Sequence, residues 1–246
     1  MTFLTTSAIE HNLSTVKENS PKVWRQVRRF NLPVQLALAA AHRVMAYATD
    51  PSQVALISIA PCQNGSPAIF RLGHAFIDRL ENNINDEFRI NPTYSLHVID
   101  NLALSSLSIA FKNHAYCLGL GGAPGQVWAG LEVVQDVLAS GRATEALLMA
   151  GDQESSENLT ESGTGVAALF TKHKTPYEHN GKYIQIKNLD SSETDECFSV
   201  KPHSADGLAA FIEEIVNRTQ NGRFLYSVPH QETDGHNNIS IEMEIT

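Results

Sequence analysis

The sequence predicts an α/β protein built on a layered sheet, and three observations support this fold class. Segments with helical and strand-like patterns alternate along the chain. The 246 residues are 42% hydrophobic and 18% charged, which suits one globular domain with a large core. The closing segment NISIEMEI repeats apolar residues at period two, as a strand does. No repeat or linker divides residues 1–246, so a single domain is expected.

Six stretches are predicted to be helical. The first begins near Ser20 and Pro21, because serine caps a helix and proline suits its first turn. The second, residues 33–48, is apolar on nearly every side and should be central. The last carries Leu208, Phe211, Ile212 and Ile215 on one face. The four helices after the second are expected at residues 67–83, 94–111, 126–140 and 205–218.

Strands are predicted between these helices and at the end of the chain. QVALISIA has strand character and ends at Pro61, and GTGVAALF and KYIQIKNL alternate like strands. The predicted strands cover residues 53–60, 114–118, 145–150, 163–170 and 182–189, followed by RFLYSV and NISIEMEI.

Charge and composition exclude several classes of function. The net charge of −9 disfavours nucleic acid as a partner, because phosphate binding needs a basic field. The chain offers no apolar run long enough to span a membrane and no pattern of a secretory signal, so a cytoplasmic protein is expected. One local basic cluster stands out and is interpreted as a solvated helix face rather than a docking site: Lys22, Arg25, Arg28 and Arg29.

The stretch CLGLGGAPGQVWAGLE contains the glycines of a GxGxxxG pattern between a strand and a helix. Gly119, Gly121 and Gly125 could let backbone amides approach a pyrophosphate, with Asp152 after the next strand as the ribose ligand. Against this NAD(P)-binding interpretation, Pro124 removes one amide donor from the turn. The chain also lacks the Tyr-x-x-x-Lys pair of a short-chain reductase.

A thiol enzyme is a second local interpretation. A reactive thiolate is exposed and stabilised by positive charge or a helix N-terminus. Cys117 instead lies within an apolar strand, where we expect a buried cysteine acting as a small hydrophobe. Cys62 and Cys197 complete the set of three, without CxxC spacing, so neither a zinc site nor a disulfide framework is expected. Three isolated histidines are interpreted as structural: His114, His203 and His236.

Taken together, these segments resemble the β-ketoacyl synthase (thiolase-like) family over nearly the whole chain. The resemblance is carried by FNLPVQLALAAAHRVMAYATDPSQVALISIAPCQNG, by NPTYSLHVIDNLALSSLSIAFKNHA and by the glycine stretch continuing into GLEVVQDVLASGRATEALLMAGDQE. In the second segment Asp100 replaces the family's histidine before Asn101. The resemblance implies a layered αβαβα thiolase-like fold, with residues 1–160 near complete and residues 161–246 a shortened C-terminal half.

The departures from the family pattern bear on catalysis. In the family, the nucleophilic cysteine lies at the start of the helix after the turn. The corresponding position in this sequence is Ala123 or Pro124. The first catalytic histidine, in an EAHGTGT segment, has no counterpart, and the second aligns with His203 in VKPHSADGLAAF without the flanking glycines. Asn238 in DGHNNISIEMEI falls at the asparagine of the last synthase hairpin.

The resemblance therefore implies a non-catalytic chain-length factor of a Gram-negative type II polyketide system, of the anthraquinone or aryl-polyene kind. Such a subunit pairs with an active ketosynthase as a heterodimer and sets the length of a poly-β-ketone, here expected to be aromatic and of octaketide type. No cofactor is expected, since the substrate is carried on the phosphopantetheine of an acyl carrier protein. That carrier is expected to dock mainly through the ketosynthase.

The resemblance also assigns residues to roles. The strand before the turn is expected to pair with the partner subunit, with interface residues His114, Ala115, Tyr116, Cys117, Leu118, Gly119, Leu120 and Trp128. The polyketide tunnel is expected to be lined by Asn31, Val34 and Leu38, with Phe70 and Phe76 as other plugs. Two alternatives stay open: a stand-alone acyltransferase or hydrolase using His203 and a serine, and a carrier-docking module using the basic residues 25–29.

Overall fold

A computed structural model describes the chain at residues 1–19, 21–28, 30–60, 77, 81–82, 101–121, 126–153, 163–178, 181–187, 196–199, 204–218, 222–229 and 236–244. Nine strands form one mixed sheet in the order β3-β2-β4-β5-β1-β6-β9-β8-β7. The strands are β1 (Thr2–Glu10), β2 (Ala55–Ile59), β3 (Cys117–Leu120), β4 (Glu145–Gln153), β5 (Gly163–Thr171), β6 (Tyr183–Lys187), β7 (Glu196–Ser199), β8 (Gly222–Pro229) and β9 (His236–Glu244).

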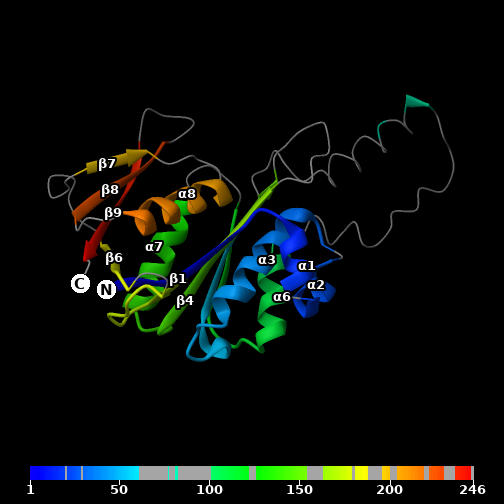
Figure 1. Cartoon of the computed structure of the whole chain (residues 1–246), viewed down its shortest axis with the longest axis horizontal. Coiled ribbons are helices and arrows are strands. Elements are labelled where there is room, and N and C mark those ends of the chain that lie inside the picture. The colour runs from blue at the N-terminus through cyan, green and yellow to red at the C-terminus, as the bar shows by residue number, and fades with distance from the viewer. Residues whose placement is uncertain are drawn as a thin grey trace.

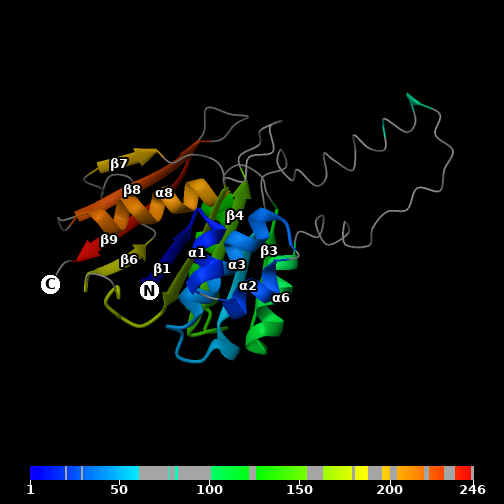
Figure 2. The same ribbon diagram turned by 45° about the vertical axis from the view of Figure 1, so that its right-hand side comes forward.

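Helices cover both faces of the first part of this sheet. The outer layer holds α1 (Leu13–Asn19), α2 (Pro21–Val27), α3 (Leu32–Met45) and α6 (Leu102–Phe111), which gather on one side of the sheet in both views (Figure 1 and Figure 2). On the other side, α7 (Gln126–Ala139) and α8 (Ser204–Asn217) lie between strands β1–β5 and strands β6–β9 (Figure 1). The described residues thus form one mixed sheet with helices on both of its faces, and the predicted layered α/β fold is confirmed.

The two helical layers enclose two separate cores. One core joins α7 and α8 to the sheet and includes the predicted apolar face of α8, whose four residues are at most 2% exposed. The other core packs α3 and α6 on the opposite face, around Leu38, Leu56 and Leu107. Because α3 is buried on nearly every side, the prediction that this helix is central is confirmed.

Helix α3 approaches the sheet closely because two glycines face it. Gly151 of β4 and Gly165 of β5 are direct partners in the antiparallel register. A Cβ atom added to Gly151 would lie 2.1 Å from the carbonyl oxygen of Pro33, and one added to Gly165 would lie 2.1 Å from the carbonyl carbon of Leu36. The backbone of α3 therefore occupies the space that two side chains would otherwise need.

Several predicted boundaries were wrong. Strand β1 was not predicted, because it is buried on both faces and so lacks the period-two alternation that reveals a half-buried strand. Helix α1 and the short strand β7 were not predicted either. The strand expected at residues 114–118 runs from Cys117 to Leu120 instead. Most of the helix expected at 67–83, and the first part of that expected at 94–111, lie outside the described residues.

Changing Gly165 to alanine should destabilise the protein, because the new methyl group meets helix backbone, which cannot rotate away. We expect a loss of about 2–3 kcal/mol in the free energy of unfolding, as for overpacked cores. Gly121→Ala is the matched control, since nothing lies within 4 Å of its added Cβ, and it should change stability by less than about 0.5 kcal/mol. Urea denaturation of both variants measures the difference, and equal stability would contradict the close approach of α3.

Candidate functional site

The candidate site lies at the carboxyl edge of three parallel strands. Strands β3, β2 and β4 are parallel neighbours, so their carboxyl ends reach one edge of the sheet. This edge is where ligands bind in open α/β sheets. The family's nucleophile position at Ala123 and Pro124 follows β3 in the sequence, but both residues, like His203, lie outside the described residues.

The N-terminus of α3 reaches this edge beside β4. Its cap residue Asn31 accepts a hydrogen bond through Oδ1 from the backbone N–H of Val34, at 3.2 Å, and Pro33 lies against Gly151. Val34 and Leu38 are 7% and 1% exposed and belong to the core shared with α6. The three predicted tunnel residues therefore follow one side of a single buried helix, which begins at the candidate site.

Asp152, at the carboxyl end of β4, holds the N-terminus of α8. Its Oδ2 accepts a hydrogen bond of 2.6 Å from the backbone N–H of Ala205. A carboxylate is favourable there, because the first amides of a helix lack partners within the helix and carry partial positive charge. The acid that the NAD(P)-binding interpretation gives to a ribose thus has a structural task, which disfavours that interpretation.

Two further polar residues of this edge escaped the sequence analysis. Thr164 lies directly opposite Asp152 in the antiparallel register of β4 and β5, and its hydroxyl is 3.3 Å from Nδ1 of His11. His11 follows β1, so the two residues meet only because β1 and β5 are neighbours. No local signal could have shown this pair, since β1 itself was missed.

Strand β3 forms one end of the sheet and pairs only with β2 among the described strands. The carbonyls of Tyr116 and Leu120 accept hydrogen bonds from the backbone N–H groups of Leu56 and Ala60, at 2.8 and 2.9 Å. Backbone groups of a strand alternate in direction. The N–H and C=O groups of Cys117 and Gly119 therefore point away from β2, toward the open edge.

Side chains on both faces of β3 remain partly exposed. Tyr116, Leu120 and Trp128 are half-buried against the core of α7, and the Arg142 guanidinium lies 5.7 Å from the centre of the Tyr116 ring. On the other face, Asn101 at the start of α6 lies against Gly119, where an added Cβ would be 1.8 Å from its Oδ1. The structure thus brings most of the predicted interface residues, with His114 and Ala115 before the strand, to one exposed edge.

Cys117 is exposed, and the prediction that it is buried was wrong. Cys117 lies on β3, an end strand with β2 as its one partner among the described strands, so less of the fold surrounds its side chain. Partial desolvation raises the pKa of its thiol, against a smaller lowering effect of a backbone hydrogen bond with Leu56. The protonated thiol therefore dominates at neutral pH, and Cys117 sits in a strand rather than at a helix N-terminus.

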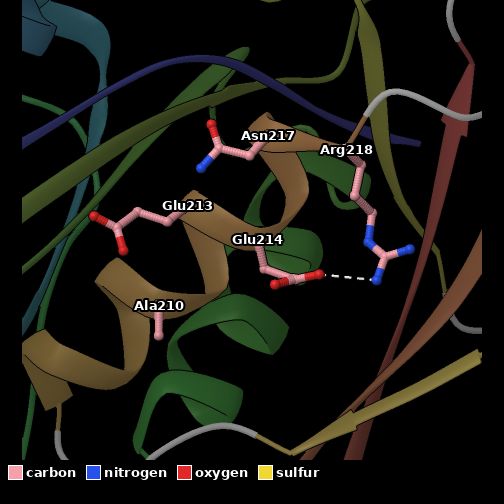
Figure 3. A pocket seen from close by; sticks show the side chains of 5 residues that line it. All are labelled: Ala210, Glu213, Glu214, Asn217 and Arg218. Atoms are coloured by element: carbon pink, nitrogen blue, oxygen red, sulfur yellow. Dashed lines mark hydrogen bonds and ion pairs between the residues drawn. The ribbon is translucent and has the colours of Figure 1, made fainter.

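A surface hollow of about 420 Å³ lies away from this edge, along the second half of α8 (Figure 3). Its lining residues all come from α8 and its end: Ala210, Glu213, Glu214, Asn217 and Arg218. Glu214 and Arg218 form an ion pair of 2.8 Å one turn apart. Since Ala205 at the other end of the helix carries the contact with Asp152, this hollow is not part of the candidate site.

Metal clusters and membrane-spanning helices are absent from the part of the chain that the structure describes. There, no three histidine, cysteine or carboxylate side chains come together in a way that could hold a metal ion. Within the same residues, no helix has the length and apolar character to cross a membrane.

No protein-family model and no curated protein matches the sequence. Solved structures do match. A ketosynthase (ApeO) in complex with its chain length factor (ApeC) from Xenorhabdus doucetiae has a TM-score of 0.53 at 14% identity, covering 87% of this chain and 79% of that one. The ishigamide ketosynthase/chain length factor gives a TM-score of 0.57 at 12% identity, covering 90% and 82%.

A third match covers 100% of this chain and 99% of that one, with a TM-score of 0.61 at 11% identity. It comes from AntDE:AntF, a type II polyketide synthase acyl-carrier protein in complex with its ketosynthase. Identities this low speak for the fold rather than for the chemistry. The chain therefore has the thiolase-like fold of ketosynthases and chain length factors.

Proposed function

We propose that this chain is a non-catalytic chain-length factor, which pairs with an active ketosynthase in polyketide biosynthesis. The observation that carries the proposal is the open edge of β3, where the outward groups of Cys117 and Gly119 have no strand beside them in the described chain. An exposed edge flanked by half-buried apolar side chains is an aggregation hazard unless another chain covers it. A strand of a partner subunit would supply the missing hydrogen bonds.

The non-catalytic part of the proposal rests on the chemistry of condensation. A ketosynthase needs a thiolate to hold the acyl chain and histidines to stabilise the developing enolate. Neither Ala123 nor Pro124, at the family's nucleophile position, has a nucleophilic side chain. Cys117 lies on the edge strand with a raised pKa, so it is a poor substitute. In this proposal the ketosynthase partner supplies the chemistry.

The proposed role of the chain is to shape the space in which the product grows. The growing poly-β-ketone passes between the phosphopantetheine of an acyl carrier protein and the thiol of the ketosynthase, and bulky side chains end its tunnel. We assign the tunnel wall to Asn31, Val34 and Leu38, because this side of α3 starts at the candidate site. Their modest side chains favour a long chamber.

Assembly through β3 can be tested with a backbone change that spares the rest of the sheet. In Cys117→Pro the lost N–H is one that points outward, so the bonds to β2 remain, and proline is tolerated on edge strands. Cys117→Ala, the matched control, keeps the N–H and loses only the thiol. We expect Cys117→Ala to co-purify one-to-one with the co-expressed ketosynthase. Cys117→Pro should bind the ketosynthase at least about tenfold more weakly.

Circular dichroism of both variants checks that each is folded. Equal assembly of a folded Cys117→Pro would contradict pairing through β3. A wild-type chain that purifies as a stable monomer and ignores the ketosynthase would contradict the proposed function and favour the stand-alone enzyme.

Control of chain length can be tested by narrowing the proposed tunnel. Val34→Phe and Leu38→Phe, in the assembled heterodimer, should shorten the product by one or more extension units, because the added ring occupies tunnel volume. Val44→Phe is the control, since Val44 is equally buried in α3 but further from the candidate site. Mass spectrometry of the products provides the measurement. Products of unchanged length from intact heterodimers would show that Val34 and Leu38 do not line the tunnel.

A further inference from the structure

A histidine at the end of β1 reaches the carboxyl edge of the sheet. Strand β1 runs in the same direction as β4, because each of them pairs antiparallel with β5. His11 is the first residue after β1, so it comes to the edge at which β4 ends. The family resemblance aligns one catalytic histidine with His203 and gives no counterpart for the other, so His11 corresponds to neither.

The ring of His11 lies on the face of the sheet that α7 and α8 cover. Gly151 and Gly165 face α3 on the opposite side, and successive side chains of a strand point to opposite faces. Asp152 and Thr164 therefore point away from α3, and the Asp152 carboxylate indeed meets the N-terminus of α8. The Thr164 hydroxyl is 3.3 Å from Nδ1 of His11, which brings the imidazole to this same face.

Thr164 holds the imidazole and leaves its outer nitrogen free. Thr164 is 8% exposed, whereas His11 is exposed. Among the described residues, Nε2 of His11 has no hydrogen-bond partner. When the Thr164 hydroxyl donates to Nδ1, the ring hydrogen lies on Nε2. The imidazole then presents one N–H donor at the edge where open α/β sheets bind their ligands.

The groups around this donor select the class of ligand. Asp152 and Thr164 are direct partners in the register of β4 and β5, and the Cβ atoms of such pairs are about 5 Å apart. A carboxylate thus lies near the imidazole and repels an anionic ligand such as a phosphate. Within the described residues no cluster could hold a metal ion. A neutral acceptor, the carbonyl oxygen of a ketone, ester or thioester, suits the N–H donor.

We propose that Nε2 of His11 binds a carbonyl oxygen of an acyl ligand, and that Thr164 is the positioning residue that holds the ring. The chain thus has an acyl-binding group that comes from β1, although Ala123 and Pro124 offer no nucleophile. The nature of the acyl group, a β-keto chain, rests on the proposed function. No covalent bond forms or breaks at His11.

The test titrates the full chain with two probes of equal length. S-acetoacetyl-N-acetylcysteamine carries two acyl carbonyls, and S-butyl-N-acetylcysteamine has the same carbon skeleton without them. Isothermal titration calorimetry compares the wild type with His11→Ala. His173→Ala is the matched control, because His173 is also exposed but follows the other end of β5. We expect His11→Ala to bind the acetoacetyl probe about fivefold more weakly or worse, and His173→Ala to stay within about twofold of the wild type.

The positioning role of Thr164 has its own measurement. Thr164→Val removes the hydroxyl and keeps a side chain of similar shape. We expect it to weaken binding of the acetoacetyl probe about threefold and to change the tautomer of the His11 ring, which nitrogen NMR of the imidazole reports. A loss of stability alone would leave this tautomer unchanged in the folded protein, so an unchanged tautomer would contradict the positioning role.

Equal affinity of the wild type and a folded His11→Ala for the acetoacetyl probe would overturn the inference. Equal affinity of the wild type for the two probes would overturn it as well. The inference and the proposed function fail separately. A chain that binds the probe through His11 and ignores the ketosynthase supports the first and contradicts the second. A chain that forms the heterodimer and does not bind the probe does the reverse.

Discussion

The seating of α3 on the glycine pair of β4 and β5 is the constraint on which the rest of the structure depends. Gly151 and Gly165 lie opposite one another, and the helix backbone fills the space above both. This contact fixes the height of α3 over the sheet and brings its cap residue Asn31 to the carboxyl edge. It also gives α2 and α6 a buried helix to pack against.

At one end of the same sheet, the backbone of β3 has an outer edge that no described strand covers. Its pairing with β2 satisfies alternate residues and leaves the polar groups of Cys117 and Gly119 directed outward. The half-buried Tyr116, Leu120 and Trp128 beside them form an apolar border. Unpaired strand groups next to half-buried apolar side chains support the proposed pairing with another subunit.

Helices with strong patterns were predictable from the sequence, and contacts between distant segments were not. The four apolar residues of α8 and the all-round apolar character of α3 revealed both helices. Strand β1 was not predictable from alternation, because both its faces are buried. Without β1, the contact between His11 and Thr164 could not be predicted either. The exposure of Cys117 depends on its being at the end of the sheet, which only strand order can show. The roles of Asn31, Val34 and Leu38 came from a resemblance and remain predictions.

The most direct test of the central claim is residue-resolved hydrogen–deuterium exchange on β3, with and without the ketosynthase. In the free chain the amides of Cys117 and Gly119 point to the open edge and should exchange fast, whereas those of β2 should be protected. We predict that the ketosynthase slows exchange at Cys117 and Gly119 and leaves β2 unchanged. Equally fast exchange at both residues in a one-to-one complex would contradict the claim that β3 is completed by the partner subunit.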